Sequence, residues 1–458
     1  FEKKQEERDK SQKKKDVLVK ARNLLDNSPE EVEWMPKINR MKILCGLLVL
    51  IMCAGIILVL LVPVFHADEM KAYYQDFIHH DILNTAHIVD RNGQDIYNGD
   101  YADSKLTRLA TFHLIGDDYD SIPTSVLAEL YANASEGNLF QGYQSQSEEI
   151  RLTIDLDLQE AAYEALVDGG YAGTVFVADY QTGEILCMVS TPSVDVKETS
   201  DNVQEGAYLN KALQTYAPGS TFKAISVACL LEKGIDPDEL GSYYCDGKDG
   251  HISCTQRHGR VNLKQALYKS CNCAISYYVE KYLTADDLDQ FVRSLGILDA
   301  DLIAGMTINE GTIDSSDDLA WTADGQSKTL MSPVGLASFY AALANDGVYQ
   351  QFSLIQGQQT TADALISQST VDYLKEALTT GMRVWYRSPI DCRSFGKTGT
   401  AELDSGKSHA WFACCLDDEE APSYVIVTML EKAGSSSKAM NLAADLINDH
   451  ILTKEASS

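Results

Sequence analysis

The feature that most constrains this chain is a long uncharged segment near its N-terminus. None of residues 43–65 carries a formal charge, and about 20 apolar residues are enough to cross the hydrocarbon core of a bilayer. A cleaved signal peptide is the rival interpretation, but the segment is long for one and residues 63–69 lack a small-residue cleavage site. The sequence therefore predicts an uncleaved transmembrane helix at residues 43–65.

Charged residues on either side of this segment predict its orientation. Lys37, Arg40 and Lys42 precede it, whereas Asp68 and Glu69 follow it. Because cytoplasmic flanks are enriched in Lys and Arg, the N-terminus is expected in the cytoplasm. Everything after residue 66 is then expected outside a cell membrane that the chain crosses once. The chain does not open on methionine, so its translation start is expected upstream or at an internal methionine.

The amino-acid composition limits the classes of partner that this chain is expected to bind. Apolar residues make up 45% of the 458 residues, which is enough for a large folded core. The formal net charge of -29 argues against a nucleic-acid partner, because phosphate binding needs a surplus of Lys and Arg. The 11 cysteines show no metal-ligand spacing, so neither a metal nor another cofactor is expected. Cys245 and Cys254 flank a predicted hairpin tip, and whether a disulfide joins them stays open.

Residue patterning predicts the domain organisation and the fold class. Residues 1–42 are predicted to form a charged cytoplasmic tail, 67–148 a membrane-proximal pedestal with a hairpin around Asn92-Gly93, and 149–458 the main domain. Strands at both ends of the main domain, around a helical middle, predict an α+β fold in which helices cover one antiparallel sheet. The expected strands are 174–178, 185–189, 395–402, 410–416 and 424–430, and the expected helices are 154–166, 221–232, 262–282, 285–295, 333–344 and 438–451.

The first segment with reactive side chains is Ser220-Thr-Phe-Lys223, which follows a Pro-Gly break and opens an apolar helix. Residues three apart share a helix face, so the Lys223 amine can hydrogen-bond the Ser220 hydroxyl. A serine nucleophile needs an adjacent base, and Lys223 is one only when neutral, which burial and a second cation such as Lys397 favour. Because Ser-x-x-Lys also occurs elsewhere in the chain, a simple helix cap is the alternative for this segment alone.

The second segment is Ser270-Cys-Asn272, a polar break between two apolar helical stretches. A polar break of this kind is suited to the lining of a substrate-binding cleft. The Ser270 hydroxyl can relay a proton from Lys223, and the Asn272 amide can both donate to and accept from a substrate peptide group. A helix cap is again the simpler alternative when the segment is taken alone.

The third segment is Lys397-Thr-Gly-Thr400, inside a predicted strand. Lys397, Thr398 and Thr400 offer positive charge and hydroxyl donors for a substrate carboxylate. Gly399 is expected to let a substrate backbone approach the strand. The backbone N–H groups of Ser220 and Thr400 are the candidates for an oxyanion hole.

The order of these segments resembles the penicillin-binding protein and serine β-lactamase superfamily. Further similarity, over residues 85–451, points to the class B penicillin-binding proteins. It lies in Ile150-Arg-Leu-Thr-Ile-Asp-Leu-Asp-Leu-Gln159, Thr182-Gly-Glu-Ile-Leu186, Ser190-Thr-Pro-Ser193, Tyr216-Ala-Pro-Gly-Ser-Thr-Phe-Lys223, Gly396-Lys-Thr-Gly-Thr-Ala-Glu402 and His409-Ala-Trp-Phe412.

The resemblance implies a peptidoglycan D,D-transpeptidase of the bacterial cell wall. In such an enzyme the active serine attacks a stem peptide at D-Ala-D-Ala, releases the terminal D-Ala and passes the acyl group to an amine acceptor. The same serine binds penicillin and other β-lactams. No glycosyltransferase domain is recognised, so a polytopic membrane glycosyltransferase is the implied partner. The resemblance assigns catalysis to Ser220, Lys223 and Ser270, and substrate binding to Asn272, Lys397, Thr398, Gly399 and Thr400.

Two departures from the family pattern are visible. Thr85-Ala86 stands where Arg-Gly usually precedes Asp-Arg-x-Gly, and Gly325-Gln-Ser327 replaces Gly-Gln-Gly. Both bear on partner contacts and acceptor positioning rather than on acylation. A D,D-carboxypeptidase, a β-lactamase and a membrane β-lactam sensor are the alternatives on the same fold. The glutamate arrangement of class A β-lactamases is not found in the chain, and a structural protein with an inactive site is disfavoured because every catalytic side chain is present.

Overall fold

The structure is a computed structural model, which describes residues 12–20, 37–65, 67–135, 149–198, 203–314, 316 and 318–453. The predicted tail at residues 1–42 therefore lies partly outside the described residues, as does the end of the predicted pedestal at 136–148. The chain divides into two compact units, Phe1–Phe77 and Ile78–Ser458.

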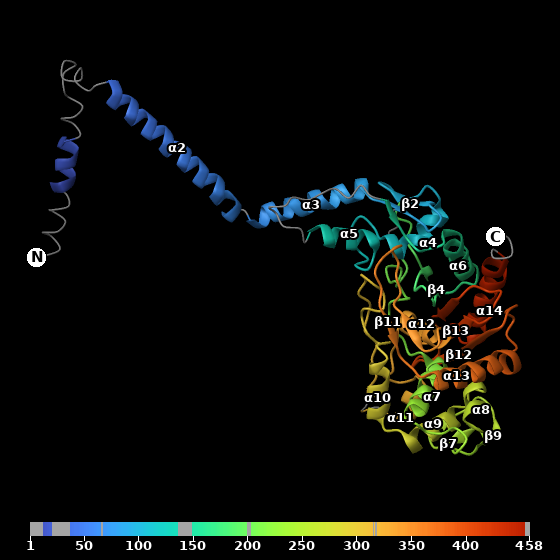
Figure 1. The fold of residues 1–458 in the computed structure, drawn as a ribbon. Helices are drawn as coiled ribbons and strands as arrows, with labels where there is room; N and C mark the ends of the chain where they lie inside the picture. The colour runs from blue at the N-terminus through green and yellow to red at the C-terminus, as the bar shows by residue number, and fades with distance from the viewer. Residues whose placement is uncertain are drawn as a thin grey trace, which may run out of the picture. The chain divides into compact units, whose positions relative to one another are not determined.

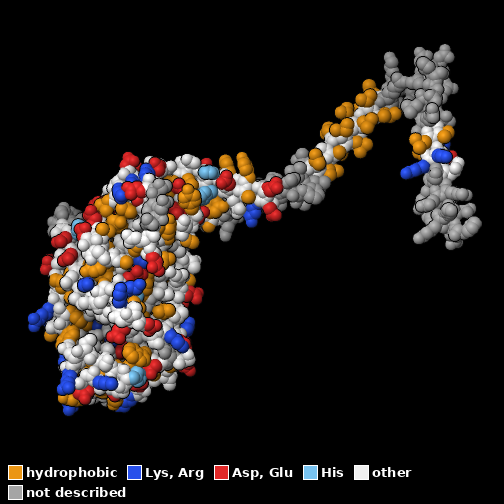
Figure 2. Space-filling model, turned by 180° about the vertical axis from the view of Figure 1, so that it is seen from behind, with side chains coloured by type: hydrophobic (Ala, Val, Ile, Leu, Met, Phe, Trp, Pro, Cys, Tyr) orange, Lys and Arg blue, Asp and Glu red, His pale blue; other side chains and the backbone are white. Residues whose placement is uncertain are grey.

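The first unit contains helix α2 (Lys37–Phe65). Its stretch Met41–Leu58 has a mean hydropathy of 2.6, and none of that stretch is buried. Figure 2 shows apolar side chains along the described part of this helix, between its two grey ends. A helix that is apolar all round is suited to lipid rather than to water. This helix is thus long and apolar enough to cross a membrane, as the uncharged segment predicts.

A five-stranded antiparallel sheet lies at the centre of the second unit (Figure 1), in the order β12-β13-β14-β4-β5. Strand β14 pairs with β4, so the sheet joins strands from the two ends of the main domain. This arrangement confirms the predicted α+β fold. The strands are β4 (Gly173–Asp179), β5 (Ile185–Thr191), β12 (Ser394–Glu402), β13 (Ser408–Leu416) and β14 (Tyr424–Leu430).

Helices cover both faces of this sheet. Helices α6 (Leu156–Asp168) and α14 (Ser436–Leu446) pack on one face, and α12 (Pro333–Ala344) packs on the other. Along β13, Phe412 belongs to the core beneath α6 and α14, whereas the Cys415 thiol donates to a carbonyl of α12 at 3.2 Å. A strand buried on both faces reads as a continuous apolar run rather than an alternating one, which is the pattern of residues 410–416.

The remaining helices and hairpins belong to the second unit, apart from the part of α3 that precedes residue 78. The predicted helix at 262–282 is interrupted after Tyr268, where the sequence has its polar break, and α13 was not predicted. The helices are α3 (Ala67–Thr85), α4 (Lys105–Ile115), α5 (Val126–Ser135), α7 (Lys223–Glu232), α8 (Leu263–Tyr268), α9 (Asn272–Tyr282), α10 (Ala285–Ser294), α11 (Leu319–Ala323), α13 (Gln368–Thr380) and the tighter or wider turns η2 (Gly219–Thr221), η3 (Gly381–Tyr386) and η4 (Ile447–Leu452). The short strands are β1 (His87–Val89), β2 (Asp95–Asn98), β3 (Glu149–Arg151), β6 (Tyr243–Cys245), β7 (Lys248–Asp249), β8 (Ile252–Ser253), β9 (Gly259–Val261), β10 (Val348–Gln350) and β11 (Ala362–Ala364).

The predicted hairpin around Asn92-Gly93 is present and is joined to the main domain by one buried carboxylate. Strands β1 and β2 pair antiparallel, and β1 also pairs in parallel with β3. The buried Asp90 carboxylate accepts the backbone N–H groups of Asn92 and Gln94, each at 2.8 Å, and that of Leu156 at 3.2 Å. One side chain therefore closes the turn and fixes the start of α6.

Replacing Asp90 by alanine should lower the free energy of unfolding by about 3 kcal/mol, because hydrogen bonds to a charged acceptor are lost and buried N–H groups are left unpaired. Urea denaturation of the full chain in detergent measures the change. Asp95→Ala is the control, since Asp95 is exposed and pairs only with His87, and its loss should cost less than about 1 kcal/mol. Equal losses in the two variants would contradict the role given to Asp90.

Candidate active site

Ser220 lies in the turn η2, directly before helix α7. The Lys223 ammonium donates to the Ser220 Oγ at 2.7 Å, as their spacing on one helix face predicts. Lys223 also forms an ion pair with Asp324, with 3.0 Å between Nζ and Oδ1, and both side chains are buried. Asp324 follows α11 and is absent from the residues that the sequence singled out, since an isolated aspartate there carries no pattern.

Ser270 lies between α8 and α9 and faces the second lysine. The Lys397 ammonium donates to the Ser270 Oγ at 2.9 Å and to the Thr398 carbonyl at 2.9 Å. Ser270 has a φ of 56°, a left-handed conformation that is costly for a residue other than glycine and that gathers at functional sites. Asn272 opens α9, and its side-chain amide donates to the Ser253 carbonyl at 2.8 Å. The three segments predicted from sequence therefore meet.

Burial sets the electrostatics of this group. Removal from water, together with the nearby Lys223 charge, holds the pKa of Lys397 well below its usual range. Burial raises the pKa of Asp324 to about 6, although its ion pair with Lys223 opposes the rise. Each shift favours the neutral form of its group. A site with a neutral Lys397 amine and a weakly acidic Asp324 carboxyl can accept and pass protons near neutral pH.

The reactive side chains open into a cleft of about 390 Å³. Lys397 is fully buried and lies behind the cleft wall, so it acts on the cleft through its hydrogen bond to Ser270 rather than by direct exposure. The wall is largely polar. Its residues include Ser220, Lys223, Ser253, Lys269, Ser270, Asn272, Trp321, Asp324, Gln326, Trp385, Thr398, Thr400 and Glu402.

Two glycines allow the turn η2 to pack directly on β12. A Cβ on Gly399 would lie 2.9 Å from the Pro218 carbonyl oxygen and 3.0 Å from the Thr221 nitrogen. A Cβ on Gly219 would lie 2.6 Å from the Thr400 carbonyl oxygen. The missing side chain of Gly399 makes room for the turn that carries Ser220. The expectation that Gly399 also lets a substrate backbone approach the strand stays a prediction.

The loop after α11 connects this turn to the strand. The Gly219 N–H donates to the Gly325 carbonyl at 2.8 Å, and the Gln326 side-chain amide donates to the Thr400 carbonyl at 3.1 Å. Ser327 has a φ of 58°, in the region that glycine adopts at no steric cost. This conformation gives a physical reason for glycine at the corresponding position of the Gly-Gln-Gly pattern.

A serine at a helix start, a buried lysine in contact with it and a polar cleft define a serine acyl-transferase. Comparison with known proteins then gives the family. Residues 173–449 match the model of the penicillin binding protein transpeptidase domain. The chain belongs to this family, and it is thus a penicillin-binding transpeptidase of cell-wall synthesis.

Individual relatives agree with this assignment. The chain is 26% identical over 352 residues to peptidoglycan D,D-transpeptidase PbpA of Mycolicibacterium smegmatis, with 66% of this chain and 71% of that protein covered. It is 28% identical over 307 residues to penicillin-binding protein 3 of Bacillus subtilis, with 58% and 45% covered.

Solved structures share the fold. The crystal structure of PBPA from Mycobacterium tuberculosis superposes with a TM-score of 0.65 at 20% identity, covering 81% of this chain and 99% of that one. A ceftriaxone acyl-enzyme complex of the same protein gives a TM-score of 0.63 at 20% identity, with the same shares covered.

A Gly399→Ala variant should acylate with a β-lactam up to about 100-fold more slowly, because the new methyl group pushes the Ser220 turn from β12 and small misplacements cost that much. The rate of labelling by a fluorescent penicillin measures it. Gly55→Ala is the control, since nothing lies within 4 Å of a Cβ there. An unchanged rate in Gly399→Ala would refute the packing argument.

Proposed function

We propose that Ser220 is the nucleophile of a D,D-transpeptidase and forms an acyl-enzyme with the stem peptide of peptidoglycan. The observation that carries the proposal is the continuous set of contacts from Asp324 through Lys223 to Ser220 at the floor of the cleft. Ser220 attacks the carbonyl of the penultimate D-Ala, and the terminal D-Ala leaves with a proton. An amine acceptor then takes the acyl group and frees the serine.

The buried pair of Lys223 and Asp324 supports a route for the first proton. When the pair holds a single proton, that proton can reside on Asp324, because the two groups are within hydrogen-bonding distance at 3.0 Å. The Lys223 amine is then free to accept the Ser220 proton. Asp324 is thus a positioning residue that acts through Lys223. Ser270, held by Lys397 at 2.9 Å, is placed to pass the proton to the leaving amine.

Substrate binding is proposed along β12, which lies at the edge of the sheet. An edge strand offers unpaired backbone groups to an extended peptide. The Thr398 and Thr400 side chains line the cleft there and are proposed to bind the substrate carboxylate, whose negative charge would favour the protonated form of the buried Lys397 behind them. Asn272 is proposed to bind the peptide amide. The backbone N–H groups of Ser220 and Thr400 remain the proposed oxyanion hole.

The membrane arrangement is proposed from α2 and its flanking charges. The basic residues in the first turns of the helix and the acidic residues after it support a cytoplasmic N-terminus and an extracytoplasmic catalytic domain. Transpeptidation needs a supply of glycan strands that it can cross-link. A polytopic membrane glycosyltransferase is therefore the proposed partner, for which the single anchor and the small membrane-proximal segment are suited.

Incubation of the full chain with penicillin should give a mass increase of one drug molecule that persists for hours, and Ser220→Ala should give none. Intact-mass spectrometry follows the adduct. A synthetic stem peptide with an added amine acceptor should yield mainly the transfer product. Release of D-Ala with hydrolysis alone would indicate a carboxypeptidase, and rapid hydrolysis of the drug without an adduct would indicate a lactamase.

The acylation rate should rise with pH through about 6, where Asp324 gives up its proton. Below that pH the pair with Lys223 holds both protons and no base is available, and above it one proton is gone. Asp324→Asn should lose this rising limb and react more slowly at neutral pH. Asp314→Asn, which removes an exposed partner of Lys328, should keep the limb. An unchanged profile in Asp324→Asn would contradict the proton route.

A further inference from the structure

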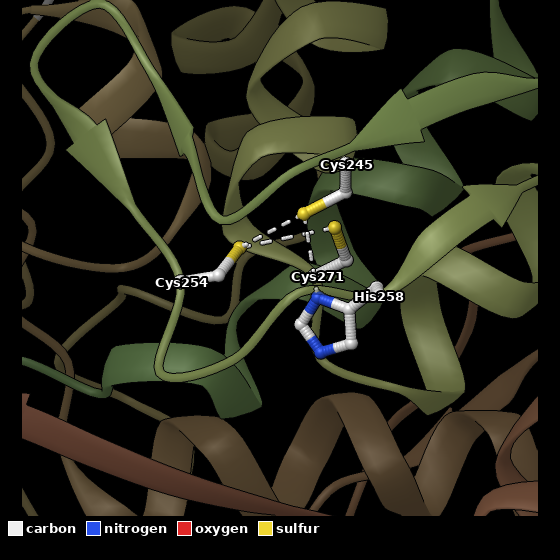
Figure 3. A group of neighbouring side chains, drawn as sticks. All are labelled: Cys245, Cys254, His258 and Cys271. Carbon is white, nitrogen blue, oxygen red and sulfur yellow. Dashed lines mark hydrogen bonds between the residues drawn. The ribbon is translucent and has the colours of Figure 1, made fainter.

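Three cysteines and one histidine converge beside the active site (Figure 3). Cys245 ends β6, Cys254 follows β8, His258 precedes β9 and Cys271 caps the start of α9. Their ligand atoms all lie within 4.8 Å of one another, and Cys245 and Cys271 are buried. All three cysteines are free thiols, so the disulfide between Cys245 and Cys254 that the sequence left open is not formed.

The spacing of these atoms is that of a tetrahedral metal site. The Cys254 Sγ lies 3.8 Å from the Cys245 Sγ and 3.8 Å from the Cys271 Sγ, and the Cys245 Sγ lies 3.6 Å from the His258 Nδ1. Around a zinc ion with bonds of about 2.3 Å to sulfur and about 2.0 Å to nitrogen, tetrahedral geometry separates two sulfurs by about 3.8 Å and a sulfur from a nitrogen by about 3.5 Å. These three distances match both values, and the other pairs of ligand atoms lie within 4.8 Å of each other.

We propose that Cys245, Cys254, His258 and Cys271 bind a zinc ion. Thiolate and imidazole ligands select zinc over the hard cations magnesium and calcium. Four protein ligands leave no open position for water, which marks a structural rather than a catalytic site. The sequence predicts no metal, because the four ligands come from separate segments and not from paired short spacings. The structure brings them together.

A fourth cysteine, Cys273, lies next to this group and contacts the sulfur of Cys254. The Cys273 N–H donates to the Cys254 Sγ at 3.5 Å, as backbone amides orient and stabilise metal-bound thiolates. The Cys273 thiol itself donates to the Ile252 carbonyl at 3.8 Å and lies 3.4 Å from the Cys254 Sγ. The His258 ring lies against Trp385, with 5.9 Å between ring centroids, which fixes its orientation toward the sulfurs.

The ion would act on the active site through the chain itself. Cys271 stands between Ser270 and Asn272, and the Asn272 amide donates to the carbonyl of Ser253, the residue before Cys254. Zinc would therefore clamp the β6–β9 segment to the start of α9 and help to hold Ser270 in its left-handed conformation. The β7–β8 pairing covers only Lys248–Asp249 with Ile252–Ser253, and so small a hairpin is marginal without further support.

Elemental analysis of the full chain, purified in detergent under reducing conditions without chelator, should find about one zinc ion per chain. The double variant Cys245→Ser with Cys254→Ser should hold less than about a tenth of that, because ligand loss removes the thiolates on which affinity depends. Cys392→Ser is the matched control, since Cys392 is a partly buried free thiol elsewhere in the fold, and it should keep the zinc. Zinc retained by the double variant would overturn the assignment.

Cobalt(II) provides a test that does not depend on the variants folding. Added to metal-free wild-type chain, it should give the visible absorption of tetrahedral cobalt and the near-ultraviolet bands of cobalt–thiolate bonds. Wild-type chain with its thiols intact that binds neither zinc nor cobalt would overturn the proposal. So would a Cys245–Cys254 disulfide in protein alkylated before its extraction from the membrane.

A separate experiment tests whether the zinc site affects the active site. Removal of zinc from the wild-type chain should slow labelling by a fluorescent penicillin by up to about 100-fold, the cost of a small misplacement of reacting groups, and added zinc should restore the rate. A metal-free chain that labels at the full rate would overturn the link to Ser270. Zinc content does not require Ser220 to react, so failure of the proposed function and failure of the zinc site are separate results.

Discussion

The close packing of the Ser220 turn against strand β12 is the contact on which the site depends. Gly219 and Gly399 make it possible, because a methyl group on either would meet backbone atoms of the other segment. The contact brings together Lys223 and Lys397, which are 174 positions apart in the sequence. Lys223 lines the cleft, whereas Lys397 lies behind the cleft wall. The rest of the sheet positions β12 at its edge, next to that turn.

The same contact forces charged groups into the interior. Two lysines and Asp324 are buried together, and an isolated buried charge is far more costly than a paired one. The ion pair of Lys223 with Asp324 and the hydrogen bonds of Lys397 to Ser270 and Thr398 offset part of that cost. What remains lowers the pKa of Lys397 and raises that of Asp324, which favours the neutral form of each. The large apolar core on both sides of the sheet supplies stability that offsets the cost of burying these charged groups.

Much of the architecture could be predicted because its signals are local. Residues 333–344 and 424–430 match the bounds of α12 and β14, since apolar periodicity and end signals lie within each segment. Helix α13 was missed, although its apolar residues face the core. That Gly399 makes room for the Ser220 turn could not be predicted, because the sequence gives no sign of which backbone approaches a glycine. Asp324 and the group of Cys245, Cys254, His258 and Cys271 were also missed. The contacts that bring these side chains together arise from the packing of separate elements, so they leave no local pattern in the sequence.

By itself the sequence determined a helix long and apolar enough to cross a membrane, the order of the three reactive segments and the contact between Ser220 and Lys223. Each of these rests on composition or on spacing within one turn of a helix. Only the tertiary structure decided that Lys397 contacts Ser270, that Asp324 is the partner of Lys223, and that a cysteine of the Ser270 segment meets a distant hairpin. Such contacts join residues far apart in the chain, and their distances depend on how whole elements pack rather than on any local pattern.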